Sequence, residues 1–354
     1  MRRQLFAEAL AIALCGATPA LAQVAPVSVD SAVSINQFFG QHAADEPDVV
    51  VDITATARFG KGWVGYARPW FRRASTDPYA VSREIYQAAL QYQKSGPIAT
   101  RIDLGYIASP IGLGLLDMRP DTNPNIMTHL SYVVPMPSFD SGAPSALPIA
   151  SSYPLGGQLT LSATKWDARA AVVAAPPNRS YVLGAATPNP RSQPTYVGGG
   201  GLSPRSGVRI GLAYATGVYA TSSEFTRPPS TDRHLGMVSL EGEYAFGYTR
   251  LTGEFTHDRI ETAAGHSVAS EWFIQGVQTI SPRWFVAARH EGANAPPRTA
   301  GKPSPTLRVS ELTGGFRLST DFTLRAAVLR RKTYFSLVND WQAGASLVWA
   351  RRWL

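Results

Sequence analysis

The chain has 354 residues, of which 44% are hydrophobic, and a formal net charge of +8 from 33 basic and 25 acidic side chains. The basic residues are spread along the chain without a Lys/Arg block, so the composition gives no support for a nucleic-acid partner. The one cysteine, Cys15, excludes an intramolecular disulfide framework.

The N-terminus carries the features of an export signal. Arg2 and Arg3 precede a mostly apolar run, residues 5–17, and Ala20-Leu21-Ala22 has the small-x-small pattern of a cleavage site. We therefore expect residues 1–22 to be a cleavable signal and residues 23–354 to be the mature chain. The apolar run is shorter than the roughly 20 residues of a spanning helix, which disfavours a retained anchor. No later run reaches that length, so a membrane-spanning form of this chain would have to be a closed β-barrel.

Period-2 alternation of apolar and polar residues predicts a succession of strands. It is clearest in two runs, 86–93 and 98–108, joined by Lys94-Ser95-Gly96-Pro97. Most runs are about as long as a tilted membrane-crossing strand of roughly 9–11 residues. In chain order, the predicted strands are 29–39, 49–58, 63–72, 86–93, 98–108, 155–165, 168–175, 194–202, 208–220, 237–246, 248–258, 268–280, 283–291, 306–318, 322–331 and 341–353.

The connections between these runs alternate strictly between short and long. The short ones are turns built from glycine, proline, serine or aspartate, such as 59–62 and 281–282. This alternation is typical of an all-β, transmembrane antiparallel β-barrel, and we expect about sixteen strands. Losing the first strand and merging another pair would give fourteen. A soluble β-sandwich is the alternative, but strands near ten residues with aromatic residues at their ends favour the barrel.

The long connection 109–154 follows the fifth predicted strand and has 46 residues, eight of them proline. Because it is rich in apolar residues, we expect it to fold against the barrel interior. Its acidic groups would then face wall arginines and form a constriction that selects by charge and size. The residues expected to line the pore and constriction are Arg58, Arg68, Arg72, Arg101, Asp103, Asp117, Arg119, Asp121, Arg250, Glu254, Arg289 and Arg325.

No motif in the chain predicts catalysis, a metal site or a cofactor. Residues 117–125 place oxygen ligands at alternate positions but lack the glycine and closing glutamate of an EF-hand, so we expect Asx turns there. The six histidines form no Ser-His-Asp grouping, and His257 and His290 fall on the apolar face near strand ends. The run Gly198–Gly201 lies in a predicted strand, where it indicates a bend or close packing.

In its strand spacing, and in having its insert as the third long connection, the chain resembles the Gram-negative outer-membrane porins of the general-diffusion and phosphate-selective types. The fragments 240–244 and 282–285 are also similar to barrel hairpins of such proteins. The resemblance implies sixteen strands, a third external loop folded into the lumen, an outer-membrane location among lipid and lipopolysaccharide, and a homotrimer. The chain departs from the family pattern of a terminal aromatic residue, since it ends Trp353-Leu354.

We therefore expect a porin that passes small hydrophilic solutes by diffusion, with a mild anion preference from Arg58, Arg68, Arg72 and Arg101. One alternative is a non-conducting surface barrel that acts as an adhesin or scaffold. Another is a barrel lipid hydrolase, for which the sequence offers no serine and histidine pair. The residues do not identify the solute, the oligomeric state or the open diameter of the pore.

Overall fold

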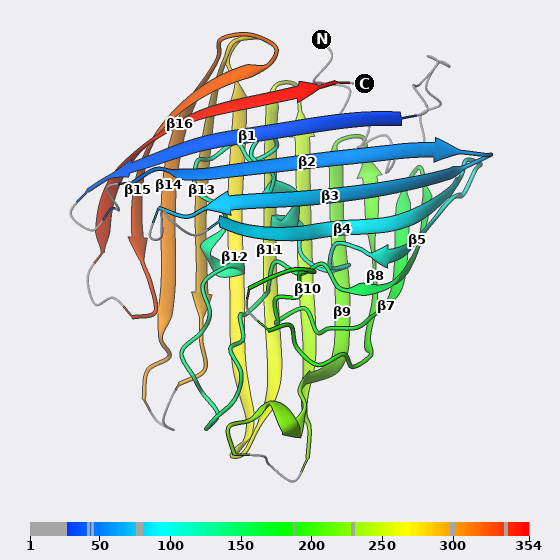
Figure 1. Cartoon of the computed structure of the whole chain (residues 1–354), viewed down its shortest axis with the longest axis vertical. Helices are drawn as coiled ribbons and strands as arrows, with labels where there is room; N and C mark the ends of the chain where they lie inside the picture. Colours follow the sequence, from blue (N-terminus) through cyan, green and yellow to red (C-terminus); the bar gives the residue numbers. More distant parts are fainter. Residues whose placement is uncertain are drawn as a thin grey trace.

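Sixteen antiparallel strands close into a barrel in the computed structural model (Figure 1). The structure describes residues 27–40, 43, 46–75, 81–186, 188–227, 231–297, 302–335 and 339–353, so the predicted export signal lies outside the described residues. The strands are β1 (Val27–Phe39), β2 (Asp48–Phe59), β3 (Trp63–Arg73), β4 (Val81–Lys94), β5 (Ala99–Tyr106), β6 (Leu155–Ala163), β7 (Trp166–Val173), β8 (Thr195–Arg205), β9 (Val208–Ala220), β10 (Arg233–Phe246), β11 (Thr249–Thr262), β12 (Gly265–Thr279), β13 (Trp284–Asn294), β14 (Thr306–Arg317), β15 (Phe322–Lys332) and β16 (Asp340–Arg352). Each strand pairs with its neighbours in sequence, and β1 pairs with β16. The predicted sixteen-stranded barrel is confirmed.

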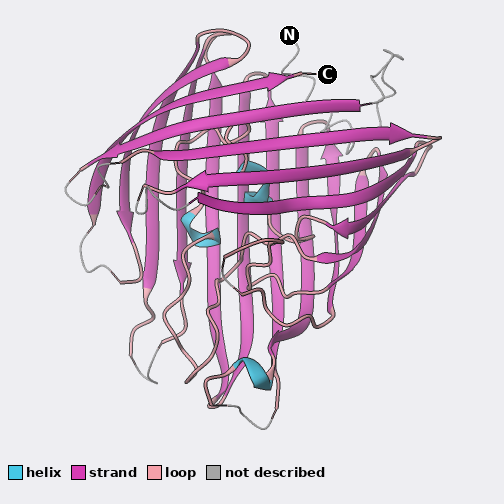
Figure 2. Ribbon diagram, in the orientation of Figure 1, coloured by secondary structure: helices cyan, strands magenta, loops and turns pink. Residues whose placement is uncertain are grey.

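Helical structure is confined to three short 3-10 turns, η1 (Leu113–Asp117), η2 (Leu130–Tyr132) and η3 (Ser222–Glu224), among the described residues (Figure 2). None of the helices in the described ranges is long and apolar enough to span a bilayer. The strands therefore form the framework of the molecule.

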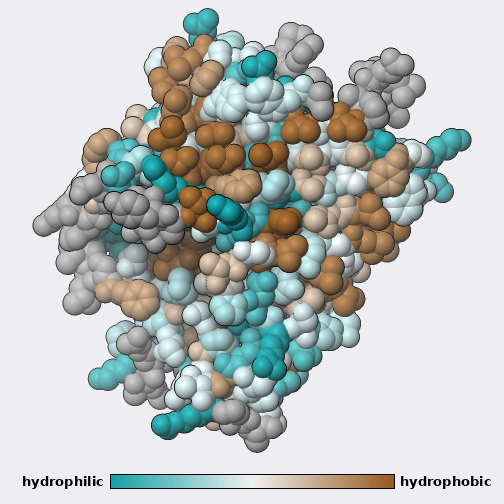
Figure 3. Space-filling model, in the orientation of Figure 1, coloured by the Kyte–Doolittle hydropathy of each residue, from teal (hydrophilic) through white to brown (hydrophobic). Residues whose placement is uncertain are grey.

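Burial alternates along many of the strands, such as β9, β13 and β16, and separates an inward from an outward face. On β13, Phe285, Ala287 and Arg289 are buried, whereas Val286 and His290 between and beside them are exposed. The outward positions are mostly apolar, and Figure 3 shows apolar side chains gathered over the region of β1 to β5. This matches the pattern of a barrel whose outer surface meets lipid.

One β-bulge changes the face on which a predicted residue lies. The sequence pattern put Tyr86 on the same face as Leu90 and Tyr92. The pairing of β3 with β4 shifts register between Arg68 and Pro69, and Tyr86 is buried while Leu90 is exposed. A bulge inserts one extra residue and reverses the parity of what precedes it. Tyr86 consequently points into the barrel.

All the short turns lie at one end of the barrel, here named the short-turn end, and the longer connections lie at the opposite long-loop end. The turn between β8 and β9 requires glycine at position 207. Gly207 has φ 78°, and a Cβ there would lie 2.0 Å from the carbonyl oxygen of Ala245. Only glycine combines this backbone conformation with so close an approach.

Residues 109–154, here named the insert, fold inside the barrel, which confirms the prediction for this loop (Figure 1). Two apolar clusters hold the insert in place. One joins insert residues such as Ile111 and Met127 to inward residues of β7 to β15, including Met237. The other joins Leu115, Met118, Tyr132, Ile149 and Tyr153 to Val50, Trp70 and Tyr86 of β2, β3 and β4.

Candidate functional site

The insert is fastened to one wall of the barrel by inward-facing glutamates on four adjacent strands. Glu254 of β11 accepts a hydrogen bond from the Leu113 amide at 2.5 Å, and Glu291 of β13 accepts one from the Leu130 amide at 2.7 Å. The remaining two bonds of this set are Ser131 Oγ to Glu271 at 3.2 Å and the Ile126 amide to Glu311 at 2.7 Å. A loop has unpaired backbone amides, and carboxylates satisfy them with charge-assisted bonds.

Two buried arginines hold the carbonyl groups of the same segment. Arg289 Nη2 donates to the carbonyl oxygen of Met127 at 2.7 Å. Arg325 Nη1 donates to the carbonyl oxygens of Asn123 and Asn125, both at 2.7 Å. We name Glu254, Glu271, Glu291, Glu311, Arg289 and Arg325 the clamp.

His129 of the insert lies against the clamp. It is fully buried, with Nδ1 2.9 Å from Glu291 Oε2 and Nε2 3.6 Å from Asp117 Oδ2. Burial and the nearby Arg289 guanidinium act to lower the pKa of His129, but the Asp117 and Glu291 carboxylates outweigh them and raise it. Burial acts to raise the pKa of Asp117, yet its bonds to His129 and Gln275 bring the net pKa below its ordinary value.

The opposite wall meets the insert through a stack of three aromatic rings. Tyr86 lies between Trp70 and Tyr153, with ring centroids 4.9 and 4.4 Å apart and interplanar angles of 18° and 14°. The Arg68 guanidinium lies 5.3 Å from the Tyr86 ring and forms a 2.7 Å ion pair with Asp52. Because Tyr153 lies near the C-terminal end of the insert, this aromatic stack ties the insert to β3 and β4.

Another part of the insert, at Arg119, also touches this wall. Arg119 Nη1 donates to Thr54 Oγ1 of β2 at 2.7 Å, and its Nε lies 2.6 Å from Asp121 Oδ1. The insert therefore contacts β2 to β4 on one side and β11 to β15 on the other. It crosses the lumen instead of lying along one wall.

Toward the short-turn end the inner wall stays polar and partly open. Arg58 and Arg250 are exposed at inward positions of β2 and β11. Arg101 is paired with Asp103 at 2.7 Å, and its side chain is 40% exposed. This half of the interior therefore carries water-facing charge.

A second polar network spans β7 to β10. Arg209 of β9 reaches across β8 to Asp167 of β7, with Nε 2.8 Å from Oδ1, and also bonds Glu241 of β10 at 2.8 Å. Arg169 pairs with the same Glu241. Gly201 of β8 leaves the room for this reach, because a Cβ there would lie 2.7 Å from Arg209 Nε.

All of the predicted site residues except Arg72 fall into three groups. Glu254, Arg289 and Arg325 belong to the clamp and Asp117 bonds beside it; Arg68, Arg119 and Asp121 lie where the insert meets β2 and β3; Arg58, Arg101, Asp103 and Arg250 lie toward the short-turn end. Arg72 pairs with Asp48 at 2.8 Å near the long-loop end.

The charge arrangement differs from the expected one, in which acidic groups of the insert face wall arginines. Asp117 faces His129 and Gln275, and Asp121 faces Arg119 of the insert itself. Asp140 does pair with Arg233, at 3.2 Å. The wall instead supplies most of the carboxylates, because they meet the backbone amides of the insert.

Sequence reasoning missed Glu271, Gln275 and Glu311, whose faces could not be assigned from the pattern. It also left His129 as an ordinary loop residue and put Tyr86 on the outer face. Glu271, Phe273 and Gln275 occupy alternate positions of β12 and share its inward face. The sequence did not reveal this face, because a phenylalanine in a barrel strand is expected to face lipid. Only the packing of Phe273 against His129, at 4.5 Å between ring centroids, explains it.

Comparison with solved structures places this architecture among known barrels. Salmonella typhi OmpF in complex with daunomycin superposes with a TM-score of 0.61 at 9% identity, covering 92% of this chain and 97% of that one. An anion-selective porin from Comamonas acidovorans gives 0.58 at 10% identity over 92% and 99% of the chains. The chain has the fold of the sixteen-stranded porins.

A trimer form of Vibrio cholerae OmpT, an outer membrane protein, shares the porin fold at a TM-score of 0.54 and 9% identity, covering 92% of this chain and 99% of that one. No protein-family model and no curated protein sequence matches the chain. At 9–10% identity these likenesses describe the porin fold and leave the activity to be argued from the residues.

Proposed function

We propose that the chain is an outer-membrane porin-type channel in which the insert restricts the diffusion of small hydrophilic solutes. The observation that carries the proposal is the clamp. Five charged side chains bond the backbone of one long loop, and a sixth, Glu271, bonds its Ser131 hydroxyl, which holds the loop across the lumen of a closed sixteen-stranded barrel. Barrels of this size otherwise leave an aqueous channel. The insert would therefore set how much of that channel stays open.

The short-turn half of the lumen supports a mild preference for anions. Arg58 and Arg250 are exposed on its inner face, and Arg101 is partly exposed beside them. Fixed charges lining a wide vestibule concentrate counter-ions. We name Arg58, Arg101 and Arg250 the residues that carry this preference. Arg68, which the sequence also suggested, is 9% exposed and paired with Asp52.

A second candidate function, a non-conducting barrel that acts as a scaffold or adhesin, is favoured by one observation. The insert meets both walls, through the clamp on β11 to β15 and through Arg119 and the aromatic stack on β2 to β4. Tight packing at every contact would close the lumen. Conductance of single refolded proteins in a planar bilayer separates the two functions, because a closed barrel gives no steps.

We infer no reaction for this chain. Among the described residues, the serine–histidine contact that invites the lipid-hydrolase alternative is Ser310 Oγ to His290 Nδ1, at 2.8 Å on the outward face. The same Nδ1 also faces the carbonyl oxygen of Val309 at 3.0 Å, which calls for a proton on that nitrogen and removes its capacity as a base toward Ser310. Covalent labelling of Ser310 by a fluorophosphonate probe would contradict this inference and support the lipid-hydrolase alternative.

The outer-membrane location and the trimer belong to the same proposal. The Vibrio cholerae OmpT structure is described as a trimer form of an outer membrane protein, and the Comamonas acidovorans structure is described as a porin. Membrane fractionation followed by mass measurement of the extracted protein tests both. A monomer in the soluble fraction would contradict them.

The decisive experiment for the channel is a reversal-potential measurement in a salt gradient. We expect small conductance steps and a reversal potential whose sign shows anion selectivity. The double variant Arg58→Gln with Arg250→Gln should give a smaller reversal potential. A cation-selective reversal potential would overturn the anion preference, and the absence of steps would overturn the channel.

A further inference from the structure

The three shortest strands of the barrel, β5, β6 and β7, are neighbours in its wall (Figure 1). They have 8, 9 and 8 residues, whereas β4 beside them has 14. β4 consequently pairs with β5 only from Ala88 to Lys94, although it pairs with β3 along its whole length. Residues 81–87 of β4 extend past the end of β5, which leaves one edge of this strand without a neighbouring strand.

Residues 177–186 of the connection between β7 and β8, here named the strap, approach this edge. Leu183 forms an isolated bridge with Ile85, whose amide donates to the carbonyl oxygen of Leu183 at 2.8 Å. In the described chain this is the one backbone hydrogen bond between the strap and β4. Gly184 permits the approach, because it has φ 83° and a Cβ there would lie 3.2 Å from the carbonyl oxygen of Arg83. A single bond therefore replaces a ladder at the seam between β4 and the strap.

The strap is fastened to the insert near its beginning. The Leu147 amide donates to the carbonyl oxygen of Asn178 at 2.9 Å, and the Tyr153 amide donates to that of Tyr181 at 2.7 Å. Residues 182–186 are held to β4 by the bond at the seam. Segments with few backbone hydrogen bonds to their surroundings open at a low cost in free energy. We therefore expect residues 182–186 to move away from β4 while the rest of the strap stays attached.

Behind the seam lies an apolar region of the lumen that Val182 of the strap fills. Val182 is 5% exposed and belongs to the cluster that joins the insert to β2, β3 and β4. Asn189 donates to the carbonyl oxygen of Val182 and accepts from its amide, both at 3.1 Å, so the backbone of Val182 does not depend on β4. The other members of this cluster, here named the chamber, are Val50, Trp70, Tyr86, Leu115, Met118, Tyr132, Ile149 and Tyr153. Outward movement of the strap would withdraw Val182 and open the chamber.

The outer surface around the seam is also apolar. Ile85 of β4, Leu155 of β6 and Val172 of β7 are exposed. Arg83 is exposed on β4 nearer the long-loop end, where the apolar surface ends. An apolar molecule in the membrane thus meets apolar side chains on both sides of the seam.

We propose that the seam is a lateral opening through which the chamber takes up a small aromatic hydrocarbon from the membrane, with Val182 as the plug. Rings and a methionine sulfur in the chamber make favourable contacts with a further ring, which favours an aromatic molecule over an alkane of equal size. Apolar cavities inside proteins stay dry and bind molecules such as benzene. This site goes beyond the proposed channel, because its ligand enters from lipid and not through the aqueous lumen.

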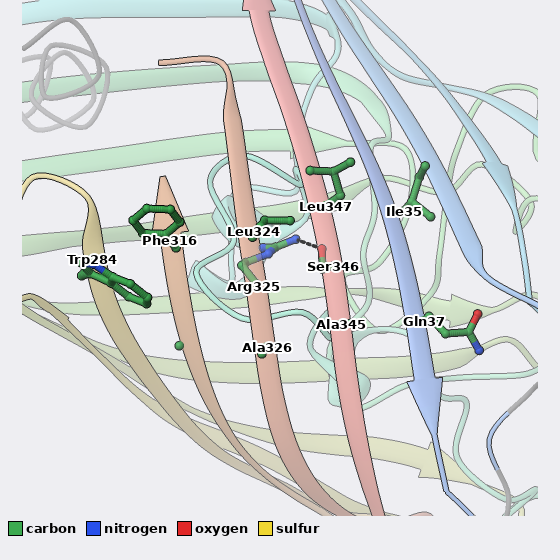
Figure 4. A pocket seen from close by; sticks show the side chains of 11 residues that line it. Ile35, Gln37, Trp284, Phe316, Leu324, Arg325, Ala326, Ala345, Ser346 and Leu347 are labelled. Carbon is green, nitrogen blue, oxygen red and sulfur yellow. Dashed lines mark hydrogen bonds between the residues drawn. The ribbon is translucent and has the colours of Figure 1, made fainter. Parts of the chain in front are cut away.

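The test is photolabelling of the full chain in liposomes with phenyl trifluoromethyl diazirine, a small aromatic probe that dissolves in lipid. Mass spectrometry of the peptides locates the label, which we expect on Tyr86 and Tyr153 of the chamber. The internal reference is an apolar depression of about 500 Å³ on the outer face around β14, β15 and β16, where Leu324 and Leu347 are exposed (Figure 4). The probe reaches this depression from lipid in every variant. Label in the depression without label in the chamber would overturn the site.

A disulfide across the seam tests the route. Ile85→Cys with Leu183→Cys places thiols on bridged residues, whose Cα separation of about 5.5 Å suits a disulfide. The native Cys15 lies in the expected signal, outside the mature chain. Oxidation should lower the label in the chamber at least fivefold relative to the depression, and a reductant should restore it. Equal label before and after oxidation would show that the probe enters elsewhere and would overturn the lateral opening.

The matched control is Leu90→Cys with Leu104→Cys, which joins β4 to β5 where their pairing is continuous. Oxidation of this variant should leave the label in the chamber unchanged. An equal loss in the control would mean that cross-linking β4 anywhere closes the chamber, which would contradict the role of the seam.

Val182→Ala tests the plug. The smaller side chain leaves more of the chamber empty, so the label on Tyr86 and Tyr153 should rise at least twofold, whereas Val172→Ala on the outward face of β7 should not change it. Equal label in the two variants would contradict the plug. All of these results are independent of conductance, because a barrel without conductance steps can still take up the probe from lipid. Failure of this site and failure of the channel are therefore distinguishable.

Discussion

His129 Nδ1 lies 2.9 Å from Glu291 Oε2, which joins the middle of a 46-residue insert to the wall of the barrel that surrounds it. Both side chains are fully buried. Removing one partner of a buried ion pair leaves the other group buried without a compensating charge, which strongly destabilises the fold. The contact attaches the insert to the barrel wall. It also makes that attachment depend on pH.

Replacing Glu291 by glutamine should loosen the insert. The variant keeps the size of the side chain but removes the charge that faces His129, and removing one partner of a buried pair typically costs about 3 kcal/mol. Limited proteolysis in micelles should show cleavage within 109–154 while the barrel stays intact. Glu243→Gln, at a more exposed position of β10, is the control. Unchanged protease resistance in Glu291→Gln would show that the pair does not hold the insert.

Attachment of the insert should depend on pH at both ends of the range. The pKa of His129 is raised, so its contribution is complete below about pH 6.5, the ordinary value, and is lost as pH rises through the raised value. The pKa of Asp117 is lowered, so its contribution is complete above about pH 4 and is lost as pH falls through the lowered value. The protection of the Leu130 amide against hydrogen exchange, taken relative to its intrinsic exchange rate at each pH, should be highest between these limits. A His129→Gln variant should lose the alkaline limb, and an identical limb in that variant would contradict the assignment.

Gly201→Ala should destabilise the barrel, whereas Gly198→Ala should not. A Cβ at Gly201 would lie 2.7 Å from Arg209 Nε, but one at Gly198 would meet nothing within 4 Å. Displacing Arg209 breaks its bonds to Asp167 and Glu241, at an expected cost of about 1–3 kcal/mol. Urea titration followed by the gel shift between folded and unfolded barrel measures this cost. Equal midpoints for the two variants would refute the proposed reach of Arg209 across β8.

Tyr153→Ala should weaken the seal between the insert and β4. Tyr153 is 1% exposed and stacks on Tyr86, so its removal leaves a cavity costing about 3 kcal/mol. Larger or noisier conductance steps are expected than in the unchanged protein. Tyr214→Ala, at an outward position of β9, is the control because Tyr214 is 51% exposed. Steps of the same size in Tyr153→Ala would mean that the aromatic stack does not close a path.

The strand pattern was predictable because the two faces of a barrel strand meet different solvents. Alternation and turn residues located all sixteen strands and the short-turn end, and the apolar content of 109–154 indicated an inserted loop. The clamp was harder to predict, since its glutamates bind backbone amides, which carry no sequence signature. Inward apolar residues such as Phe273 and Met237 also weaken the alternation, because an inserted loop makes part of the inward face apolar.

Local irregularity accounts for the other differences. The bulge beside Pro69 turned Tyr86 inward, and alternation alone cannot reveal an added residue. The glycines of β8 indicated close packing, as the structure shows at Gly201, but the partner Arg209 lies on another strand. Contacts between residues on different strands, such as Gly201 with Arg209, depend on the register between those strands. The alternation of residues within one strand does not reveal that register.

The most direct test of the account compares single-channel conductance of the unchanged protein with that of Glu254→Gln, Glu291→Gln and Glu311→Gln combined. These three carboxylates accept the amide hydrogen bonds of the insert at Leu113, Leu130 and Ile126. If the clamp restricts the lumen, the unchanged protein should give small steps and the triple variant clearly larger ones. Large steps of equal size in both proteins would contradict the account.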